Sequence, residues 1–448
     1  MRLLVVIGLI FGTACAADWP QWMGEQRDGV WREDGILEKF PAGGPKVLWR
    51  TPIGAGYSGP AVVGDRVYVT DRILNEGVER PKDNFKKGQL NGKERVLCLN
   101  RADGSEIWKH EYECVYDVQY ASGPRTTPSV AGGKVYTLGT EGDLLCLDAS
   151  NGKVLWEHNY KKDFTVTSPV WGFAASPLVD GQKLICLARG KGTTVVAYDK
   201  DSGKEIWRAL EAPEPGYCPP VIYELNGKRQ LIIWDPISLN GLDPETGKVF
   251  WTQPFTSRAG LSISMPRKLL LADGSEALFI TSFYNGSMLV KFVKDQEKPT
   301  VVWRGVKISE KDTDGLHSIM PTPLIEDGYV YGVCSYGQFR CLKVESGERV
   351  WESFIPTGGP FPNAEGERWA NTFIIKNGDR VFLPNEKGDL ISAKLSPKGY
   401  EEISRAHVLE ATNTALQRMV VWSHPAFAHK CMFIRNDKEI VCVSLSKD

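Results

Sequence analysis

The sequence predicts an all-β fold, an eight-bladed β-propeller whose blades are four-stranded antiparallel sheets. Three observations support this prediction. One strand-and-turn unit recurs along the chain, its copies lie 44 to 59 residues apart, and the two ends of the chain carry complementary incomplete units. No long segment shows the apolar period of an amphipathic helix. A closed array of repeats can also accommodate 448 residues, which is long for one compact domain.

The clearest copy of the unit spans residues 134–156 (KVYTLGTEGDLLCLDASNGKVLW). It contains three short runs of β-branched, aromatic and aliphatic residues. Two turn signals separate these runs, one around Gly142 and one at Asn151-Gly152. Residues 126–131 (TTPSVA) supply a fourth strand, which a proline introduces. Four antiparallel strands in about 35 residues are typical of a propeller blade.

The recurrence of the unit gives the number of blades. The last strand of a unit ends in a tryptophan at seven places: Trp49, Trp108, Trp156, Trp207, Trp251, Trp303 and Trp351. An eighth equivalent without tryptophan spans residues 402–408. Opening strands also occur eight times, beginning near residues 58, 126, 175, 219, 265, 322, 371 and 423. Eight blades of about 50 residues follow, which is within the usual range for propellers.

The ends of the chain predict how the ring closes. The strand around Trp49 has no blade before it, and the last unit, residues 419–445, holds only three strands. If the N-terminal strand is the outer strand of the last blade, two exposed sheet edges disappear, and such edges promote aggregation. We therefore expect the propeller to span residues 46–448, closed by its N-terminal strand.

The first 16 residues resemble a secretory signal peptide. Arg2 precedes an apolar run at 3–11, and Ala14-Cys15-Ala16 is a small-residue cleavage signature. The run is too short to span a bilayer as a helix. We expect an exported protein, periplasmic or secreted, without a transmembrane helix. A lipoprotein anchored through Cys15 is the alternative; it is disfavoured because Gly12 stands where such signals carry Leu, Val or Ile.

Two further segments lie outside the repeat. Residues 17–45 contain Trp19, Trp22 and Trp31. We expect this segment to pack on the propeller, since clustered tryptophans usually serve burial, and a ligand-stacking platform is the alternative. Residues 73–94 form a polar insertion in the first unit, which we interpret as a long hairpin loop on the surface.

Charge and motif content exclude several classes of function. The formal net charge is −1 with mixed signs, so neither a nucleic-acid stripe nor a polybasic membrane patch is present. The six histidines form no HxH or HExxH pattern, and we expect no metal site. The cysteines after position 16 include four at one repeat position, where other units carry alanine. They therefore indicate buried thiols rather than disulfides.

The candidate ligand site is the axial mouth, where the segments before the opening strands converge. Arginine pairs with carboxylate or phosphate, and tryptophan stacks on flat rings, so the mouth suits an anionic ring-bearing ligand or a glycan. The alternative is that these polar groups only hydrogen-bond one another around a water-filled funnel. The candidate residues are Arg125, Trp171, His317, Arg368, Trp369, Asn371, Trp422 and His424.

The repeated pattern GxVYxLxxxGxLxCLDAxxGKxLW resembles the pyrroloquinoline-quinone-type propeller repeat from Lys46 to the end of the chain. The opening DWPQWMGEQRDGVW and the blocks WGFAASPLVDG, SFYNGS and DGLHSIMPTP are similar to secreted bacterial propellers of unassigned function in the quinoprotein alcohol dehydrogenase-like superfamily. Its members include quinone-dependent alcohol dehydrogenases and a propeller lipoprotein of the outer-membrane assembly machinery. The dehydrogenases carry a vicinal disulfide against their cofactor, and this sequence has no adjacent cysteines.

Three functions remain open, because a fold of this kind hosts many. The favoured one is a non-catalytic binding or scaffold propeller of the cell envelope, a monomer without a cofactor, whose partner is an envelope protein or a small anionic or glycan ligand. The second is a quinone-dependent oxidoreductase, which would need pyrroloquinoline quinone and a calcium site of carboxylate and amide oxygens; Asn371 could contribute, but no paired carboxylate stands out. The third is a glycan-binding or glycan-cleaving propeller.

Overall fold

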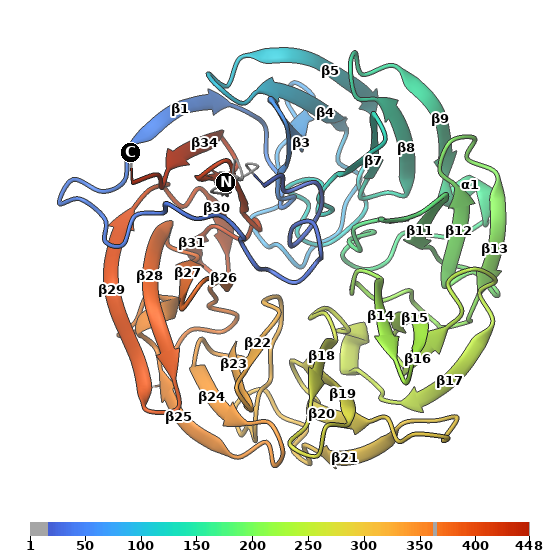
Figure 1. Ribbon diagram of the computed structural model, residues 1–448. Helices are drawn as coiled ribbons and strands as arrows, with labels where there is room; N and C mark the ends of the chain where they lie inside the picture. Colours follow the sequence, from blue (N-terminus) through green and yellow to red (C-terminus); the bar gives the residue numbers. More distant parts are fainter. Residues whose placement is uncertain (1–16, 362–364, 448) are drawn as a thin grey trace, which may run out of the picture.

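The computed structural model describes residues 17–361 and 365–447. The predicted signal peptide, including Cys15, lies outside these residues. Eight four-stranded antiparallel sheets are arranged around a central axis, which confirms the eight-bladed propeller (Figure 1). Among the described residues, no helix is long and apolar enough to cross a membrane.

Each blade runs from an inner strand beside the axis to an outer strand on the perimeter. Blade 1 consists of β2 (Ala61–Val63), β3 (Arg66–Leu74), β4 (Gly92–Asn100) and β5 (Glu106–Glu113), and blade 2 of β6 (Ser129–Ala131), β7 (Lys134–Leu138), β8 (Asp143–Asp148) and β9 (Val154–Asn159). Blade 3 consists of β10 (Leu178–Asp180), β11 (Lys183–Leu187), β12 (Val195–Asp199) and β13 (Glu205–Ala209), and blade 4 of β14 (Val221–Leu225), β15 (Lys228–Trp234), β16 (Ser238–Leu242) and β17 (Val249–Pro254).

Blade 5 consists of β18 (Arg267–Leu270), β19 (Glu276–Ser282), β20 (Gly286–Lys291) and β21 (Thr300–Arg304), and blade 6 of β22 (Leu324–Glu326), β23 (Tyr329–Val333), β24 (Phe339–Lys343) and β25 (Arg349–Ser353). Blade 7 consists of β26 (Ile375–Asn377), β27 (Arg380–Pro384), β28 (Asp389–Ser396) and β29 (Gly399–His407), and blade 8 of β32 (Ala426–Ala428), β33 (Cys431–Arg435), β34 (Glu439–Ser444) and β1 (Val47–Pro52). The remaining elements are short: α1 (Tyr160–Asp163), η1 (Arg258–Gly260), η2 (Ile355–Thr357), and the hairpin of β30 (Asn413–Ala415) and β31 (Arg418–Val420).

The ring closes through the N-terminal strand, as predicted. β1 pairs antiparallel with β34, so the last blade has the order β1-β34-β33-β32. Trp49 lies opposite Cys442 in this pairing. The last blade thus combines strands from the two ends of the described chain, and β1 is its outer strand.

The repeated tryptophans and turn glycines stabilise the contact between successive blades. The Trp108 indole donates a hydrogen bond of 3.0 Å to the carbonyl of Ala149 in the next blade. Gly152 in the following turn has φ +76°, and a Cβ there would lie 2.5 Å from the Trp108 ring. The tryptophan ring of one unit therefore packs against the turn glycine of the next unit, where a larger residue would clash. This contact explains why both residues recur.

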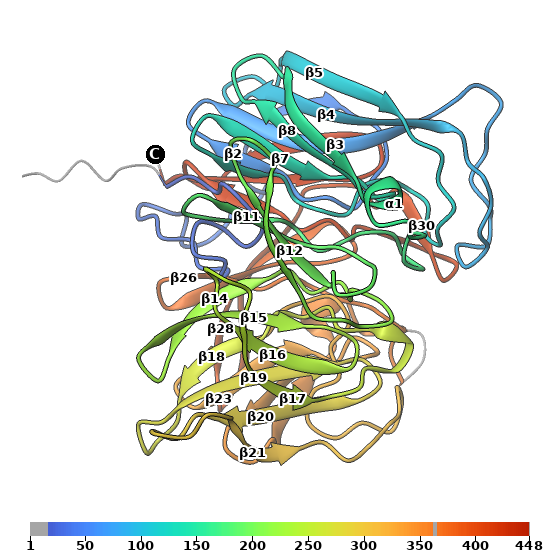
Figure 2. The ribbon, with the colours of Figure 1, turned by 90° about the vertical axis from the view of Figure 1, so that its right-hand side faces the viewer.

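The propeller has two different faces. The connections between blades and the loops between second and third strands lie on one side, which we call the connection face. The remaining turns lie on the opposite side, the turn face. Figure 2 shows the β3–β4 loop and β30 extending on one side and the dark blue N-terminal segment on the other.

Residues 17–45 run along the inner strands near the turn face. Trp19 forms a β-bridge with Val62 in β2, and Val30 forms one with Lys376 in β26. Trp31 is 1% exposed. The segment crosses the centre of the ring in Figure 1. All nine cysteines of the described residues are free and buried.

Candidate functional site: an aromatic axial cavity

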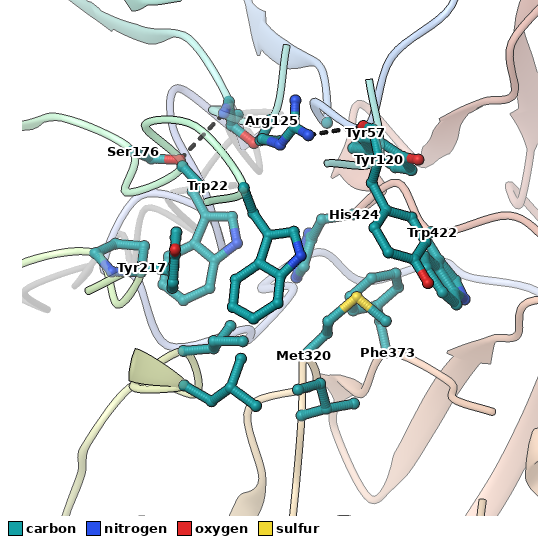
Figure 3. A pocket seen from close by; sticks show the side chains of 18 of the residues that line it. Trp22, Tyr57, Tyr120, Arg125, Ser176, Tyr217, Met320, Phe373, Trp422 and His424 are labelled. Atoms are coloured by element: carbon teal, nitrogen blue, oxygen red, sulfur yellow. Dashed lines mark hydrogen bonds between the residues drawn. The ribbon is translucent and has the colours of Figure 1, made fainter. Parts of the chain in front are cut away.

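An axial cavity of about 220 Å³ lies at the centre of the ring. Every one of the eight connections between blades contributes a side chain to its wall. Six connections contribute an aromatic ring: Tyr57, Tyr120, Trp171, Tyr217, Trp369 and Trp422. The other two, which precede β18 and β22, contribute Leu261, Ile263, Ile319 and Met320. The wall is therefore aromatic around most of its circumference and aliphatic on one side (Figure 3).

The N-terminal segment closes the end of the cavity toward the turn face. Trp22 lines the cavity, and its ring centroid lies 5.9 Å from that of His424. Behind it, the buried Arg27 donates hydrogen bonds to the carbonyls of Pro177 and Pro220 just before two inner strands. Arg27 thus attaches the segment to two blades at this end of the cavity.

The loop between β3 and β4 covers part of the other end. Phe85 from this loop packs edge-on against Tyr120 at 5.3 Å and tilted against Trp369 at 5.9 Å between ring centroids. Asn84 accepts a hydrogen bond of 2.7 Å from the backbone amide of Tyr120 and donates one to the carbonyl of Thr414 in β30. The predicted surface hairpin thus reaches from blade 1 across the connection face to the β30–β31 hairpin.

Five of the eight candidate residues line the cavity: Arg125, Trp171, Trp369, Trp422 and His424. Arg125, however, is already engaged by the protein. Its guanidinium donates to the carbonyls of Gly123, Gln119 and Tyr120 at 2.7 to 2.8 Å. The residue therefore fixes the connection between blades 1 and 2, and only part of its donor capacity remains for a ligand.

The other three candidates lie outside the cavity wall. His317 is fully buried, and its ring nitrogens contact the carbonyl of Phe283 and a carboxylate oxygen of Asp314. Arg368 forms an ion pair of 2.7 Å with Glu310. Asn371 is buried and donates to the carbonyl of Trp369. His317 and one terminal nitrogen of Arg368 are thus bonded within the protein, whereas Nε of Arg368 and Oδ1 of Asn371 are buried without a partner among the described residues.

Burial sets the charge state of the groups around the cavity. Desolvation lowers the pKa of His424 to about 4, so its imidazole is neutral at pH 7. Desolvation also raises the pKa of the buried Glu386, and hydrogen bonds from Arg418 and Trp422 oppose that shift. The Trp422 indole donates to Glu386 at 2.9 Å. This bond holds the Trp422 ring in place at the wall.

The candidate residues predicted from the sequence did not include Tyr57, Tyr120 and Tyr217, and for Trp22 the sequence favoured packing over the alternative of ligand stacking. The sequence does contain a pattern that locates part of this wall, namely the spacing of residues from the proline before each inner strand. Seven inner strands are preceded by a proline, and the residue three positions before that proline lines the cavity in each case: Tyr57, Arg125, Ala174, Tyr217, Ile263, Met320 and Trp422. Trp22 belongs to no repeat, so no register could place it.

The cavity wall does not fit pyrroloquinoline quinone with a metal ion. Calcium sites are built from several oxygen ligands, mostly carboxylates, and no aspartate or glutamate of the described residues lines this cavity. No group of three or more His, Cys, Asp or Glu within the described parts of the chain could hold a metal ion. The quinone itself carries several carboxylates, which need cationic partners, and Arg125 is largely committed to backbone carbonyls.

Comparison with known proteins identifies the family. A family model described as "Outer membrane protein assembly factor BamB" matches residues 92–353, more than half of the chain. No match is found among curated proteins.

Solved structures share the fold. BamB from Moraxella catarrhalis has a TM-score of 0.53 at 16% identity, covering 88% of this chain and 97% of its own. A europium-containing methanol dehydrogenase has a TM-score of 0.59 at 13% identity, with coverages of 95% and 89%. A quinohemoprotein alcohol dehydrogenase from Comamonas testosteroni has a TM-score of 0.61 at 13% identity, with coverages of 96% and 81%. Because the family model matches more than half of the chain, the chain belongs to the BamB-type family of pyrroloquinoline-quinone-like repeat propellers.

Proposed function

We propose that the protein is a non-catalytic binding propeller of the cell envelope that holds a small ligand in its axial cavity. The observation that carries this proposal is the composition of the wall. All eight connections direct aromatic or aliphatic side chains to one cavity, and neither a carboxylate nor a cysteine lines it. Ligand pockets are typically concave and mostly apolar, with few polar groups. Catalysis would need an activated nucleophile or a base of suitable pKa, and the only histidine of the wall has a pKa of about 4.

The predicted signal peptide and the matching family model support placement in the cell envelope. The signal-like residues 1–16 and the family description, an outer membrane protein assembly factor, point to the same compartment. Fractionation of cells expressing the full chain, beside a variant lacking residues 2–16, tests this placement. We expect the full chain in the envelope fraction and the variant in the cytoplasm. Recovery of both in the cytoplasm would contradict the proposal.

A direct assay separates binding from oxidation. The purified chain is incubated with pyrroloquinoline quinone, calcium or a lanthanide, a primary alcohol and an electron-accepting dye. We expect no dye reduction above the protein-free control, and saturable quenching of tryptophan fluorescence by a cavity ligand. Quinone-dependent dye reduction that is lost in a Trp171→Ala variant would establish the oxidoreductase alternative instead.

A second candidate function, docking of an envelope protein, is supported by the distribution of exposed apolar side chains. Among the described residues, the large exposed hydrophobics outside the outer strands lie almost entirely on the connection face, with Val306 83% exposed. They are Ile73, Phe85, Val115, Ile237, Val306, Ile308, Ile355 and Met419. The turn face carries Leu270. Scattered exposed hydrophobics need no explanation, but concentration on one face is typical of an interaction surface.

Photo-crosslinking in living cells tests this second candidate. A photoreactive residue is placed at Val306 or Ile308 on the connection face, and at Leu270 on the turn face as the matched control. We expect a discrete crosslinked species from the connection face only. Equal crosslinking from Leu270 would remove the support for a docking face.

A further inference from the structure

We infer that the axial cavity takes an uncharged, planar aromatic ligand of one or two fused rings. This inference rests on the proposed binding function and adds the chemical class of the ligand. It differs from the anionic or glycan ligand that the sequence alone suggested. Size, charge and hydrogen-bonding capacity of the wall lead to it independently.

Size limits the ligand to a few rings. An apolar protein cavity of about 150 Å³ is large enough to bind benzene. The axial cavity measures about 220 Å³ and can therefore admit a somewhat larger flat molecule. Its wall offers the faces and edges of Trp22, Trp171, Trp369 and Trp422. Aromatic rings prefer offset-stacked or edge-to-face neighbours, which such a wall provides in several orientations.

Charge argues against an anion. The cationic side chain at the wall, Arg125, has its two terminal nitrogens hydrogen-bonded to protein oxygens, including three backbone carbonyls. His424 is neutral because burial lowers its pKa to about 4. Arg368 lies outside the wall and is paired with Glu310. A carboxylate or phosphate entering this cavity would lose its hydration and would find four of the five N–H groups of Arg125 already donating to protein oxygens, so it would gain few hydrogen bonds in return.

Hydrogen-bonding capacity argues against a sugar. A sugar ring presents hydroxyl groups on all sides and needs many polar partners, whereas this wall contributes few. The hydroxyl of Ser176 already accepts a bond of 3.1 Å from the backbone amide of Thr127. Three polar groups of wall residues, the hydroxyls of Tyr57 and Tyr120 and the indole N–H of Trp369, have no hydrogen-bond partner among the described residues. These groups have almost no accessible surface, so they offer no hydrogen bond to a sugar in the cavity.

The wall is also held ready for a ligand. Tyr120 and Trp369 both have left-handed backbone conformations, with φ of 52° and 64°. Such conformations are unfavourable for bulky residues and concentrate at functional sites. Their rings pack on each other at 5.9 Å, and Trp422 packs on both at 6.0 and 6.2 Å. A pre-formed aromatic cluster reduces the ordering cost of binding.

Three matched probes test the inference, followed by tryptophan fluorescence of the full mature chain at pH 7. Naphthylmethanol is the uncharged aromatic, naphthoate has the same rings with a carboxylate, and methyl glucoside is the sugar. We expect saturable binding of naphthylmethanol, binding of naphthoate at least about tenfold weaker, and none of methyl glucoside. Trp171→Ala should weaken naphthylmethanol binding by about tenfold. Trp303→Phe, which changes a tryptophan of the outer strand β21 far from the cavity, should leave binding unchanged.

The possible failures are distinguishable. Equal or tighter binding of naphthoate, or tighter binding of methyl glucoside, overturns the ligand class and leaves the proposed binding function standing. No saturable binding of any probe overturns both. If Trp171→Ala and Trp303→Phe have equal effects, naphthylmethanol binds elsewhere on the protein, and the assignment to the axial cavity is wrong.

Discussion

The two ends of the axial cavity are closed in different ways. Toward the turn face, the N-terminal segment inserts Trp22 and Arg27 and adds β-bridges to inner strands. Toward the connection face, the cover is the β3–β4 loop, whose Phe85 is 38% exposed and whose Asn84 is only half-buried. Buried hydrogen-bonded contacts open rarely, whereas exposed loops with few buried contacts open easily. A ligand should therefore enter and leave through the connection face.

The largest expected difference between the two ends is in stability. Trp31 packs against Phe382 and Phe427 at 5.5 and 5.1 Å between centroids, and its indole donates to Glu33. Trp31→Ala should lower the free energy of unfolding by about 3–5 kcal/mol, because it leaves a large buried cavity. Urea unfolding measures this change. A loss below about 1 kcal/mol would mean that the N-terminal segment is attached only loosely.

The next largest effect is the pH dependence of stability that His424 causes at the end of the cavity toward the turn face. His424 has a pKa of about 4 in the folded chain, against 6.5 for an unperturbed histidine. Between these values the unfolded chain binds a proton that the folded chain does not. Stability is therefore complete above about pH 6.5 and falls as the pH decreases toward 4, by roughly 3 kcal/mol.

Unfolding free energies of the parent chain and of His424→Gln, measured from pH 4 to 8, isolate this contribution. Other titrating groups are common to both chains and cancel in the difference. The two curves should converge as the pH falls through this window. Parallel curves would show that the imidazole is not held neutral by burial.

The smallest stability effect is expected at the loop. Phe85→Ala removes a partly exposed ring contact, worth about 1 kcal/mol. Its main consequence should be kinetic, because Phe85 covers Tyr120 and Trp369. Stopped-flow mixing with naphthylmethanol should show association several-fold faster than in the parent chain. Phe361→Ala, in the contact with Phe354 outside this cluster, is a matched control and should leave the rate unchanged. Unchanged association in Phe85→Ala would move the entrance elsewhere.

The fold was predictable because each blade repeats the same local chemistry. Tryptophan in one unit and glycine in the next mark a single packing contact, as at Trp108 and Gly152. The unpaired strand around Trp49 and the three-stranded last unit then required ring closure, and the β1–β34 pairing confirms it. Strand order follows from the sequence here because almost all pairing is between neighbours.

The site was only partly predictable. The repeat register locates side chains at the axis, but it does not reveal which hydrogen-bond partners they already have. Arg125 and Arg368 carried the expectation of an anionic ligand, and carbonyls and Glu310 occupy them in the folded chain. Trp22 lies outside the repeat and reaches the cavity only because residues 17–45 fold back across the ring. Such long-range contacts leave no periodic trace in the sequence.

The position of a bound ligand decides whether the axial cavity is the binding site. Crystals of the mature chain with bromo-naphthylmethanol allow the bromine to be found by its anomalous scattering. We predict one dominant bromine position inside the axial cavity, between Trp171 and Trp369. Bromine found only on the perimeter or on the turn face, with an empty axial cavity, would contradict this prediction.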